Sequence, residues 1–262
     1  MDGDILRGKR ALITGASSGL GVAFAKNLAG RGCNLILVAR RDDLLRNVQR
    51  EISDRYKVEV EIVSMDLSAA ESPTALYEQI KKAGRAVDVL VNNAGFGVYG
   101  EFKDVSWEKE KEMLDLNMIT VTHLTKLFLS DMLDRNFGYI LNVASTGAYQ
   151  ATPLYAIYSA TKSFVLLFSE ALNYELKNTN VKCTVLSPGV TETEFHKVAG
   201  QQYGWYHRVT MMKSEDVAQI GIESMLKGKP SLVAGLMNAI TIWLNRFSPR
   251  SLSTASAYYL MK

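Results

Sequence analysis

Short apolar runs alternate with longer stretches of helical spacing along most of this chain. The apolar runs predict strands at residues 10–14, 34–39, 58–63, 87–91, 139–143 and 182–186, with a candidate final strand at 231–234. The stretches between them predict helices over 20–29, 42–56, 107–135 with a break, and 154–177. Two more helices are expected to begin near Pro73, where proline is tolerated, and at Ser214, which we expect to be the N-cap.

This alternation of strands and helices predicts the fold class. Strands that are apolar throughout are typical of a parallel sheet covered on both faces. Right-handed crossovers then give a three-layer, doubly wound α/β sandwich of the Rossmann type. The sequence contains no proline-, glycine- or serine-rich linker, so we expect one domain over residues 1–262. The order of the strands in the sheet does not follow from the sequence.

A glycine-rich loop joins the first predicted strand to the first predicted helix, in the segment Thr14-Gly-Ala-Ser-Ser-Gly-Leu-Gly21. Gly15 allows a sharp turn, Gly19 lets backbone approach a pyrophosphate, and Gly21 lets the helix pack closely. The free N–H groups of the helix N-terminus favour the phosphates. A glycine turn without a ligand is the alternative, but the flanking strand and helix favour a dinucleotide site. The predicted contacts are Gly15, Ser17, Ser18, Gly19, Leu20 and Gly21.

The end of the second strand indicates which dinucleotide binds. An NAD site usually has an acid there, whereas this chain has Arg40 and Arg41. A guanidinium can bind the 2′-phosphate of NADP in a bidentate way. The alternative is that both arginines simply begin a solvated helix. We therefore expect NADP(H) as the cofactor.

A tyrosine and a lysine four positions apart, Tyr158 and Lys162, share one face of the predicted helix. The ordinary tyrosine pKa of about 10 is high for acid–base work, and a neighbouring ammonium is expected to lower it. Ser145 follows the fifth strand, where its hydroxyl can hold a substrate oxygen. Asn117 lies in the preceding helical stretch and could position a water that relays protons to Lys162. A single Tyr-x-x-x-Lys match is weak evidence, and the glycine loop strengthens it.

Taken together, these segments resemble the short-chain dehydrogenase/reductase family over about residues 8–225. Further matching segments are Asp66-Leu67, Asn92-Asn-Ala-Gly95, Tyr158-Ser-Ala-Thr-Lys162 and Ser187-Pro-Gly-Val-Thr-Glu-Thr193. The resemblance implies a catalytic tetrad of Asn117, Ser145, Tyr158 and Lys162, with Tyr158 and Lys162 also contacting the cofactor. It implies further cofactor contacts at Asp66, Leu67, Asn93, Ala94, Gly95, Pro188, Gly189, Val190, Thr191 and Thr193. The segments 158–164 and 169–175 resemble the branch that holds ketoacyl and hydroxysteroid reductases, so lipid-like carbonyls are plausible substrates.

Apolar segments near the expected nicotinamide position are candidates for the substrate pocket. They are Phe96–Tyr99, Ala148-Tyr149, Leu154 and a stretch from Phe195 to Met212 that resembles the family's substrate lid, placed near 190–213. Packing in the core or at a subunit contact is the alternative for any one of them. Residues 231–245 carry no charge and begin an apolar extension over 231–262. We expect a helix there at the pocket rim or a subunit interface, and contact with a membrane surface is the less favoured alternative.

Composition narrows the function classes further. A net charge of +3 is too small and too scattered to indicate nucleic-acid binding. Cys33 and Cys183 lie in apolar strands and are expected to be buried thiols. The three histidines lack metal-ligand spacing, so no catalytic metal is expected. The polar N-terminus has no signal-peptide core, which favours the cytoplasm.

The sequence thus predicts an enzyme that interconverts a small-molecule carbonyl and an alcohol by hydride transfer, with Tyr158 as the acid–base group. The family resemblance implies a homodimer or homotetramer. An NAD-linked alcohol dehydrogenase and a non-catalytic NADPH-binding regulatory protein are the alternatives. A sugar-nucleotide epimerase is disfavoured because the chain has no room for a large C-terminal substrate domain.

Overall fold

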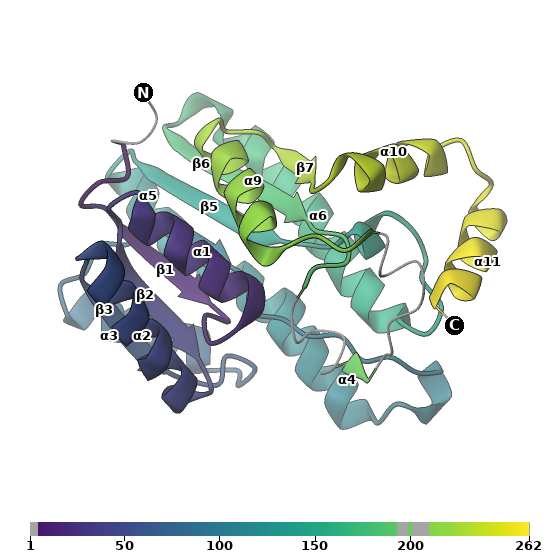
Figure 1. The fold of residues 1–262 in the computed structure, drawn as a ribbon, viewed down its shortest axis with the longest axis horizontal. Helices are drawn as coiled ribbons and strands as arrows, with labels where there is room; N and C mark the ends of the chain where they lie inside the picture. The colour runs from purple at the N-terminus through teal and green to yellow at the C-terminus, as the bar shows by residue number, and fades with distance from the viewer. Residues whose placement is uncertain (1–4, 193–198, 201–209, 262) are drawn as a thin grey trace.

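A single sheet of seven parallel strands forms the centre of the protein (Figure 1). The computed structural model describes residues 5–192, 199–200 and 210–261. The strands lie in the order β3-β2-β1-β4-β5-β6-β7. Their bounds are β1 Arg10–Thr14, β2 Asn34–Ala39, β3 Val60–Ser64, β4 Val89–Asn92, β5 Gly138–Val143, β6 Val181–Ser187 and β7 Ser231–Val233. The strand order reverses between β1 and β4, and open α/β sheets bind ligands at such a point.

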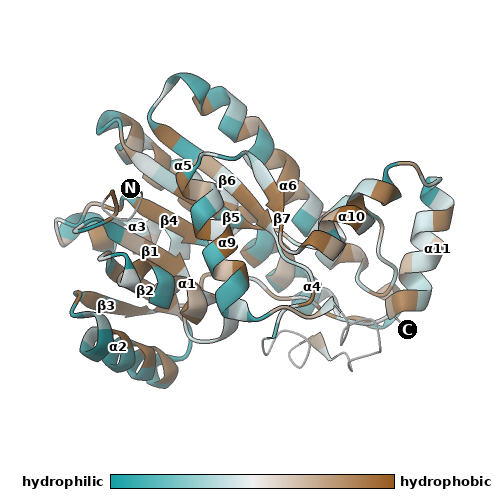
Figure 2. Ribbon diagram, turned by 45° about the horizontal axis from the view of Figure 1, so that its top comes forward, coloured by the Kyte–Doolittle hydropathy of each residue, from teal (hydrophilic) through white to brown (hydrophobic). Residues whose placement is uncertain are grey.

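Helices cover both faces of the sheet, which confirms the three-layer, Rossmann-like fold class. Their bounds are α1 Gly19–Gly30, α2 Asp42–Tyr56, α3 Ser72–Lys82, α4 Trp107–Leu114, α5 Val121–Asp134, α6 Ala156–Glu175 and α9 Ser214–Leu226. One face packs against α1, α2 and α9, and the other against α3, α5 and α6. Brown, hydrophobic ribbon therefore gathers in the strands, while the outer helix surfaces are more polar (Figure 2).

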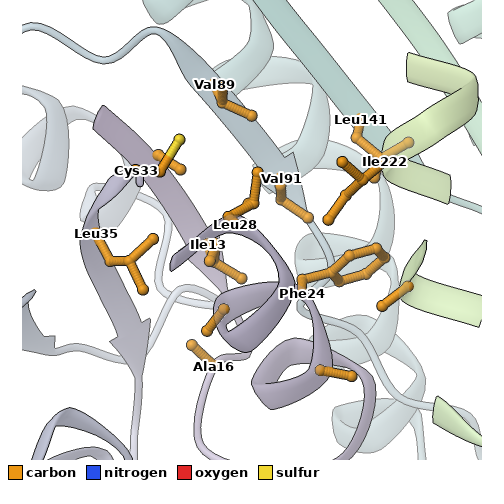
Figure 3. Close-up of a cluster of buried hydrophobic side chains, with 14 of the residues drawn as sticks. Ile13, Ala16, Phe24, Leu28, Cys33, Leu35, Val89, Val91, Leu141 and Ile222 are labelled. Carbon is orange, nitrogen blue, oxygen red and sulfur yellow. The ribbon is translucent and has the colours of Figure 1, made fainter. Parts of the chain in front are cut away.

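Alternate residues of each strand enter the two layers of core. Ile13 of β1 belongs to the cluster beneath α1, whereas its neighbour Leu12 packs on the opposite side. In the first cluster Phe24 of α1 and Ile222 of α9 lie over the central strands (Figure 3). Strands buried on both faces explain why their sequences are continuously apolar rather than alternating.

Several predicted boundaries differ from the structure. The break expected in the helix over 107–135 is a π-helical turn, Asp115–Thr120, between α4 and α5. Helix α6 begins at Ala156 rather than at residue 154, because Leu154 has a left-handed backbone with φ of 68°. The prediction of Ser214 as an N-cap was wrong. Lys213 occupies that position, and the Ser214 hydroxyl donates a 2.7 Å hydrogen bond to the Glu192 carbonyl.

The C-terminal extension forms two helices that project beyond the sheet (Figure 1). The predicted final strand is β7, and the uncharged stretch after it forms α10, Leu236–Asn245. Helix α11, Arg250–Met261, was not predicted. The α10–α11 pair lies past the carboxyl end of β7, on the side of the sheet where the ligand site is expected.

Candidate active site

A cleft with a volume of about 700 Å³ runs along the carboxyl ends of the strands. It brings together nearly every residue predicted for the site from β1 through β6. Its lining includes Gly15, Ser17, Ser18, Gly19, Leu20, Gly21, Arg40, Arg41, Asp66, Leu67, Asn93, Ala94, Gly95, Ser145, Tyr158, Lys162, Pro188, Gly189, Val190 and Thr191. Asn117 lies just behind this lining, and Thr193 lies outside the described residues.

The glycine loop has the geometry that a dinucleotide needs. Gly15 and Gly19 have φ of 66° and 53°, a region that residues with side chains adopt at a cost. A Cβ at Gly15 would come within 2.9 Å of the Ala94 backbone, and one at Gly21 would collide with the Gly15 carbonyl. No acidic residue lies in the first turn of α1, so its free N–H groups remain attractive to phosphate. The loop therefore fits a pyrophosphate.

Hydrogen bonds fix this loop against the end of β4. The Thr14 hydroxyl accepts hydrogen bonds from the backbone N–H groups of Asn93 and Ala94, at 3.0 and 2.9 Å. The Asn93 amide donates in return to the Thr14 carbonyl at 2.9 Å. These hydrogen bonds fix the positions of the glycine loop and the end of β4 relative to each other.

The two arginines after β2 have different surroundings. The Arg41 guanidinium reaches back to the glycine loop, donating to the Ser18 hydroxyl at 2.7 Å and to the Ser17 hydroxyl at 3.2 Å. Arg40 instead forms ion pairs with Glu112 at 2.9 Å and with Asp66 at 3.7 Å. The Arg41 guanidinium thus lies against two hydroxyls of the glycine loop, whereas the Arg40 guanidinium lies against two carboxylates.

Tyr158, Ser145 and Lys162 meet in the middle of the cleft. Ser145 follows β5 and caps the 3-10 helix Thr146–Tyr149, with its oxygen accepting from the Gly147 N–H at 3.1 Å. The Tyr158 hydroxyl forms a hydrogen bond with Ser145. One turn further along α6, the Lys162 Nζ donates to the Val143 carbonyl at 2.8 Å and lies 5.9 Å from the centre of the Tyr158 ring. Two hydroxyls therefore face the cleft beside a buried amine.

Burial controls the ionisation of this pair. Loss of solvent raises the pKa of Tyr158 to about 12, although the hydrogen bond with Ser145 acts in the opposite direction. The same loss of solvent lowers the pKa of Lys162 to about 8. The expected lowering of the Tyr158 pKa by Lys162 is not seen in this structure, where burial raises that pKa and the hydrogen bond with Ser145 opposes the rise. At neutral pH the phenol keeps its proton.

Asn117 lies in the π-helical turn, and such turns are frequent at functional sites. Its side chain accepts from the Phe96 N–H at 3.2 Å and donates to the Phe96 carbonyl at 2.9 Å and to Thr161 at 3.1 Å. A Cβ added at Gly95 would lie 2.8 Å from the Asn117 oxygen and 3.3 Å from the Lys162 Nζ. The two side chains thus converge on Gly95, and the relay role predicted for Asn117 stays a prediction.

The far end of the cleft is built by α10 and α11. Thr241, Ile242 and Leu244 of α10 line it, as do Ala257 and Leu260 of α11. The helix predicted after residue 231 thus lies at the pocket rim, one of the two positions expected for it. The remaining lining there is mostly small or polar, from Asn238, Asn245, Ser248, Ser253, Ser256 and Met261.

A hydrogen-bonded link holds the two C-terminal helices to the catalytic loop. The Asn245 amide donates to the Gln150 side chain at 2.8 Å, and its oxygen accepts from Ser253 of α11. Sequence reasoning missed Gln150 and α11. The recurrence of small and apolar residues at Ser253, Ala257 and Leu260 is the helical signal that was available.

The predicted substrate segments divide into three groups. Phe96 and Tyr149 line the cleft, whereas Val98 and Leu154 line a small separate cavity. Tyr99 packs edge-on against Tyr155, whose ring lies 5.7 Å from that of Tyr158. Residues 195–198 and 201–209 of the predicted lid, with Tyr203, Trp205 and Tyr206, lie outside the described residues.

Cysteines and groups of metal ligands are the other features that could form a second site among the described residues. Cys33 and Cys183 are free, buried thiols, as predicted, and burial raises the pKa of both to about 12. Within the described ranges, no group of three or more histidine, cysteine or acidic side chains is arranged to hold a metal ion.

Comparison with known proteins agrees with this geometry. The model of the short chain dehydrogenase family matches residues 9–204. The very-long-chain 3-oxoacyl-CoA reductase of Bos taurus is 35% identical over 245 residues, which cover 90% of this chain and 77% of the relative. The reductase of that name from Homo sapiens is 33% identical over 239 residues, 89% of this chain and 74% of the relative.

Solved structures show the same fold with either nicotinamide cofactor. A short-chain dehydrogenase from Sphingobium yanoikuyae in complex with NADPH superposes with a TM-score of 0.82 and 27% identity, covering 94% of each chain. A short-chain dehydrogenase/reductase from Burkholderia phymatum in complex with NAD gives a TM-score of 0.82 and 26% identity, covering 92% of this chain and 94% of the other.

Proposed function

Because this chain belongs to the short-chain dehydrogenase family, we propose that it is an NADP(H)-dependent oxidoreductase that reduces a largely apolar carbonyl compound to an alcohol. The observation that carries the proposal is the pair of hydroxyls of Tyr158 and Ser145, hydrogen-bonded to each other at the wall of the cleft. Both lie between the glycine loop and the far end of the cleft at α10 and α11, where a cofactor and a substrate would meet.

The chain's own groups suit proton donation to a carbonyl oxygen. A bound nicotinamide cofactor supplies the hydride. The Ser145 hydroxyl holds the substrate oxygen, and Tyr158 delivers its proton to that oxygen. Since burial raises the pKa of Tyr158 to about 12, the phenol is protonated at neutral pH and holds the proton that carbonyl reduction requires. Lys162, with its pKa lowered to about 8, then lies one helical turn away to return a proton, with Asn117 beside it.

Arg41 supports a preference for NADPH over NADH. Its guanidinium and the hydroxyls of Ser17 and Ser18 offer one positive charge and several donors at the place where a 2′-phosphate would lie. An acid that would bind ribose hydroxyls is absent from the positions directly after β2, which are Arg40 and Arg41. Arg40 contributes positive charge beside Asp66 and Glu112 rather than a direct clamp.

The substrate class follows from the far end of the cleft. Ile242, Leu244 and Leu260 offer apolar surface, and threonine, asparagine and serine side chains line much of the rest. Relatives named 3-oxoacyl-CoA reductases support a lipid-like carbonyl. We propose, in addition, a cytoplasmic protein that assembles as a homodimer or homotetramer.

A panel of carbonyl compounds, followed at the nicotinamide absorbance, tests the proposal. Consumption of NADPH that rises with the apolar length of the ketone is expected. Formation of NADH from NAD+ with alcohols, in preference to NADPH consumption with carbonyls, would instead assign an NAD-linked alcohol dehydrogenase. Tight NADPH binding without turnover on any member of the panel would assign a regulatory role.

A further inference from the structure

The outward face of α10 carries a continuous stripe of exposed apolar side chains. Leu236, Met237, Ile240, Trp243, Leu244 and Phe247 follow one another at intervals of one and three residues, the spacing of a single helix face. Leu236 is 76% exposed and Phe247 72%. Leu252 and Tyr259 of α11 add two more exposed apolar side chains. Side chains of this size in one contiguous set mark an interaction surface rather than ordinary surface composition.

The charged residues of the C-terminal segment that carries this stripe have one sign. From residue 224 to the C-terminus the sequence contains five lysines and arginines and no aspartate or glutamate. Arg246 and Arg250 are exposed beside the stripe, and no ion pair is seen for either within the described part of the chain. An apolar helix face with flanking arginines and a tryptophan is the pattern of a helix that lies in a membrane interface.

The same two helices form the far wall of the cleft. Asn238 and Ile242 of α10 face inward, opposite the stripe, and Leu244 belongs both to the lining and to the exposed face. Whatever covers the stripe therefore lies on the outer side of the helix whose inner side lines the far end of the cleft. Among the described residues, no helix is both long and apolar enough to cross a bilayer.

We propose that the stripe on α10, with Leu252 and Tyr259 of α11, docks on the surface of an anionic lipid bilayer. Met237, Trp243 and Phe247 enter the boundary between headgroups and acyl chains, and Arg246 and Arg250 bind lipid phosphates. A second copy of the chain is a poorer occupant. A two-fold interface built on this surface would place Arg246 and Arg250 of both copies in one interface to which residues 224–262 contribute no carboxylate.

The docking rests on this surface and not on the proposed reaction, so it is tested without cofactor or substrate. The purified full chain is floated with vesicles of phosphatidylcholine, with or without phosphatidylglycerol. Binding is expected to the anionic vesicles and to weaken with added salt. Replacing Arg246 and Arg250 together (Arg246→Gln/Arg250→Gln) should weaken the binding about five-fold for each arginine.

The apolar contribution is tested with the triple variant Met237→Ser/Trp243→Ser/Phe247→Ser. None of these three side chains lines the cleft, so NADPH binding should be retained and serves as the check of folding. Vesicle affinity should fall on the order of 100-fold, because three large apolar side chains no longer enter the interface. The matched control is Leu167→Ser/Tyr174→Ser, which removes exposed apolar side chains from α6 and should leave vesicle binding unchanged.

Three outcomes overturn the docking. The first is absence of binding to anionic vesicles, and the second is equal binding by the triple variant and the control. The third is a result from light scattering: the unmodified chain is an oligomer that does not bind vesicles, and the triple variant is a monomer. That result assigns the surface to a second copy of the chain. Should the triple variant fail to fold, the arginine variant still decides the electrostatic part.

Discussion

Removing the Arg41 side chain should lower the affinity for NADPH much more than that for NADH. Arg41 donates to Ser18 at 2.7 Å and to Ser17 at 3.2 Å, so its guanidinium is already held where a 2′-phosphate would lie. A hydrogen bond to a charged group contributes about 1.5–3 kcal/mol. Since Arg41 is exposed, the lower value applies, and Arg41→Ala is expected to weaken NADPH binding about 10-fold.

Titration of both cofactors by calorimetry or nicotinamide fluorescence measures this difference. Arg46→Ala is the matched control, because Arg46 is an exposed arginine on the same helix that pairs with Asp42 instead of the glycine loop. Its NADPH affinity should stay near that of the unmodified protein. Arg40→Asp should also weaken the preference for NADPH, by placing an acid at the end of β2. An unmodified protein that binds both cofactors equally, or an Arg41→Ala variant that loses both equally, would refute the reasoning.

Three further changes test the site. Tyr158→Phe should lower turnover about 10²- to 10⁴-fold with little effect on NADPH binding, and retention of most activity would exclude Tyr158 as the proton donor. Gly21→Ala should lower thermal stability and cofactor affinity together, because its methyl group meets the Gly15 carbonyl; an unchanged Tm would contradict this. Since burial lowers the Lys162 pKa from 10.5 to about 8, the unfolded chain binds more protons between these values, and stability should rise with pH. In urea unfolding, the free energy of unfolding of the unmodified protein relative to that of Lys162→Met should increase by about 2 kcal/mol between pH 8 and pH 10. A difference that stays constant with pH would contradict the lowered pKa of Lys162.

The sequence was sufficient for the fold class and for the residues, from the glycine loop to Gly95, that line the expected cofactor half of the cleft. Strands such as Asn34–Ala39 are apolar throughout, and in a chain with helices between the strands this pattern is typical of a parallel sheet buried on both faces. The glycine loop was predictable because its function depends on backbone conformation at named positions, such as Gly15. Features of this kind depend on a short segment of sequence, so they can be predicted without knowledge of tertiary contacts.

The substrate half was predicted less well because it depends on contacts between distant segments. Gln150 meets Asn245 across 95 positions of sequence, and neither residue carries a local signal of that contact. Helix α11 was missed because the polar turn around Pro249 ended the apolar stretch that preceded it. The different surroundings of Arg40 and Arg41 are likewise tertiary, since Glu112, which binds Arg40, belongs to α4.

The pKa of Tyr158 shows most clearly what sequence spacing leaves out. Placing Tyr158 and Lys162 on one face of α6 is a local fact, and by itself it predicts a phenol made more acidic by a nearby ammonium. The fold buries both side chains, however, and loss of solvent acts on each group more strongly than they act on one another. The phenol therefore holds its proton more tightly while the amine releases its own more readily. The structure therefore leaves a protonated phenol at the wall of the cleft, as the proposed carbonyl reduction requires, whereas the spacing alone predicts a more acidic one.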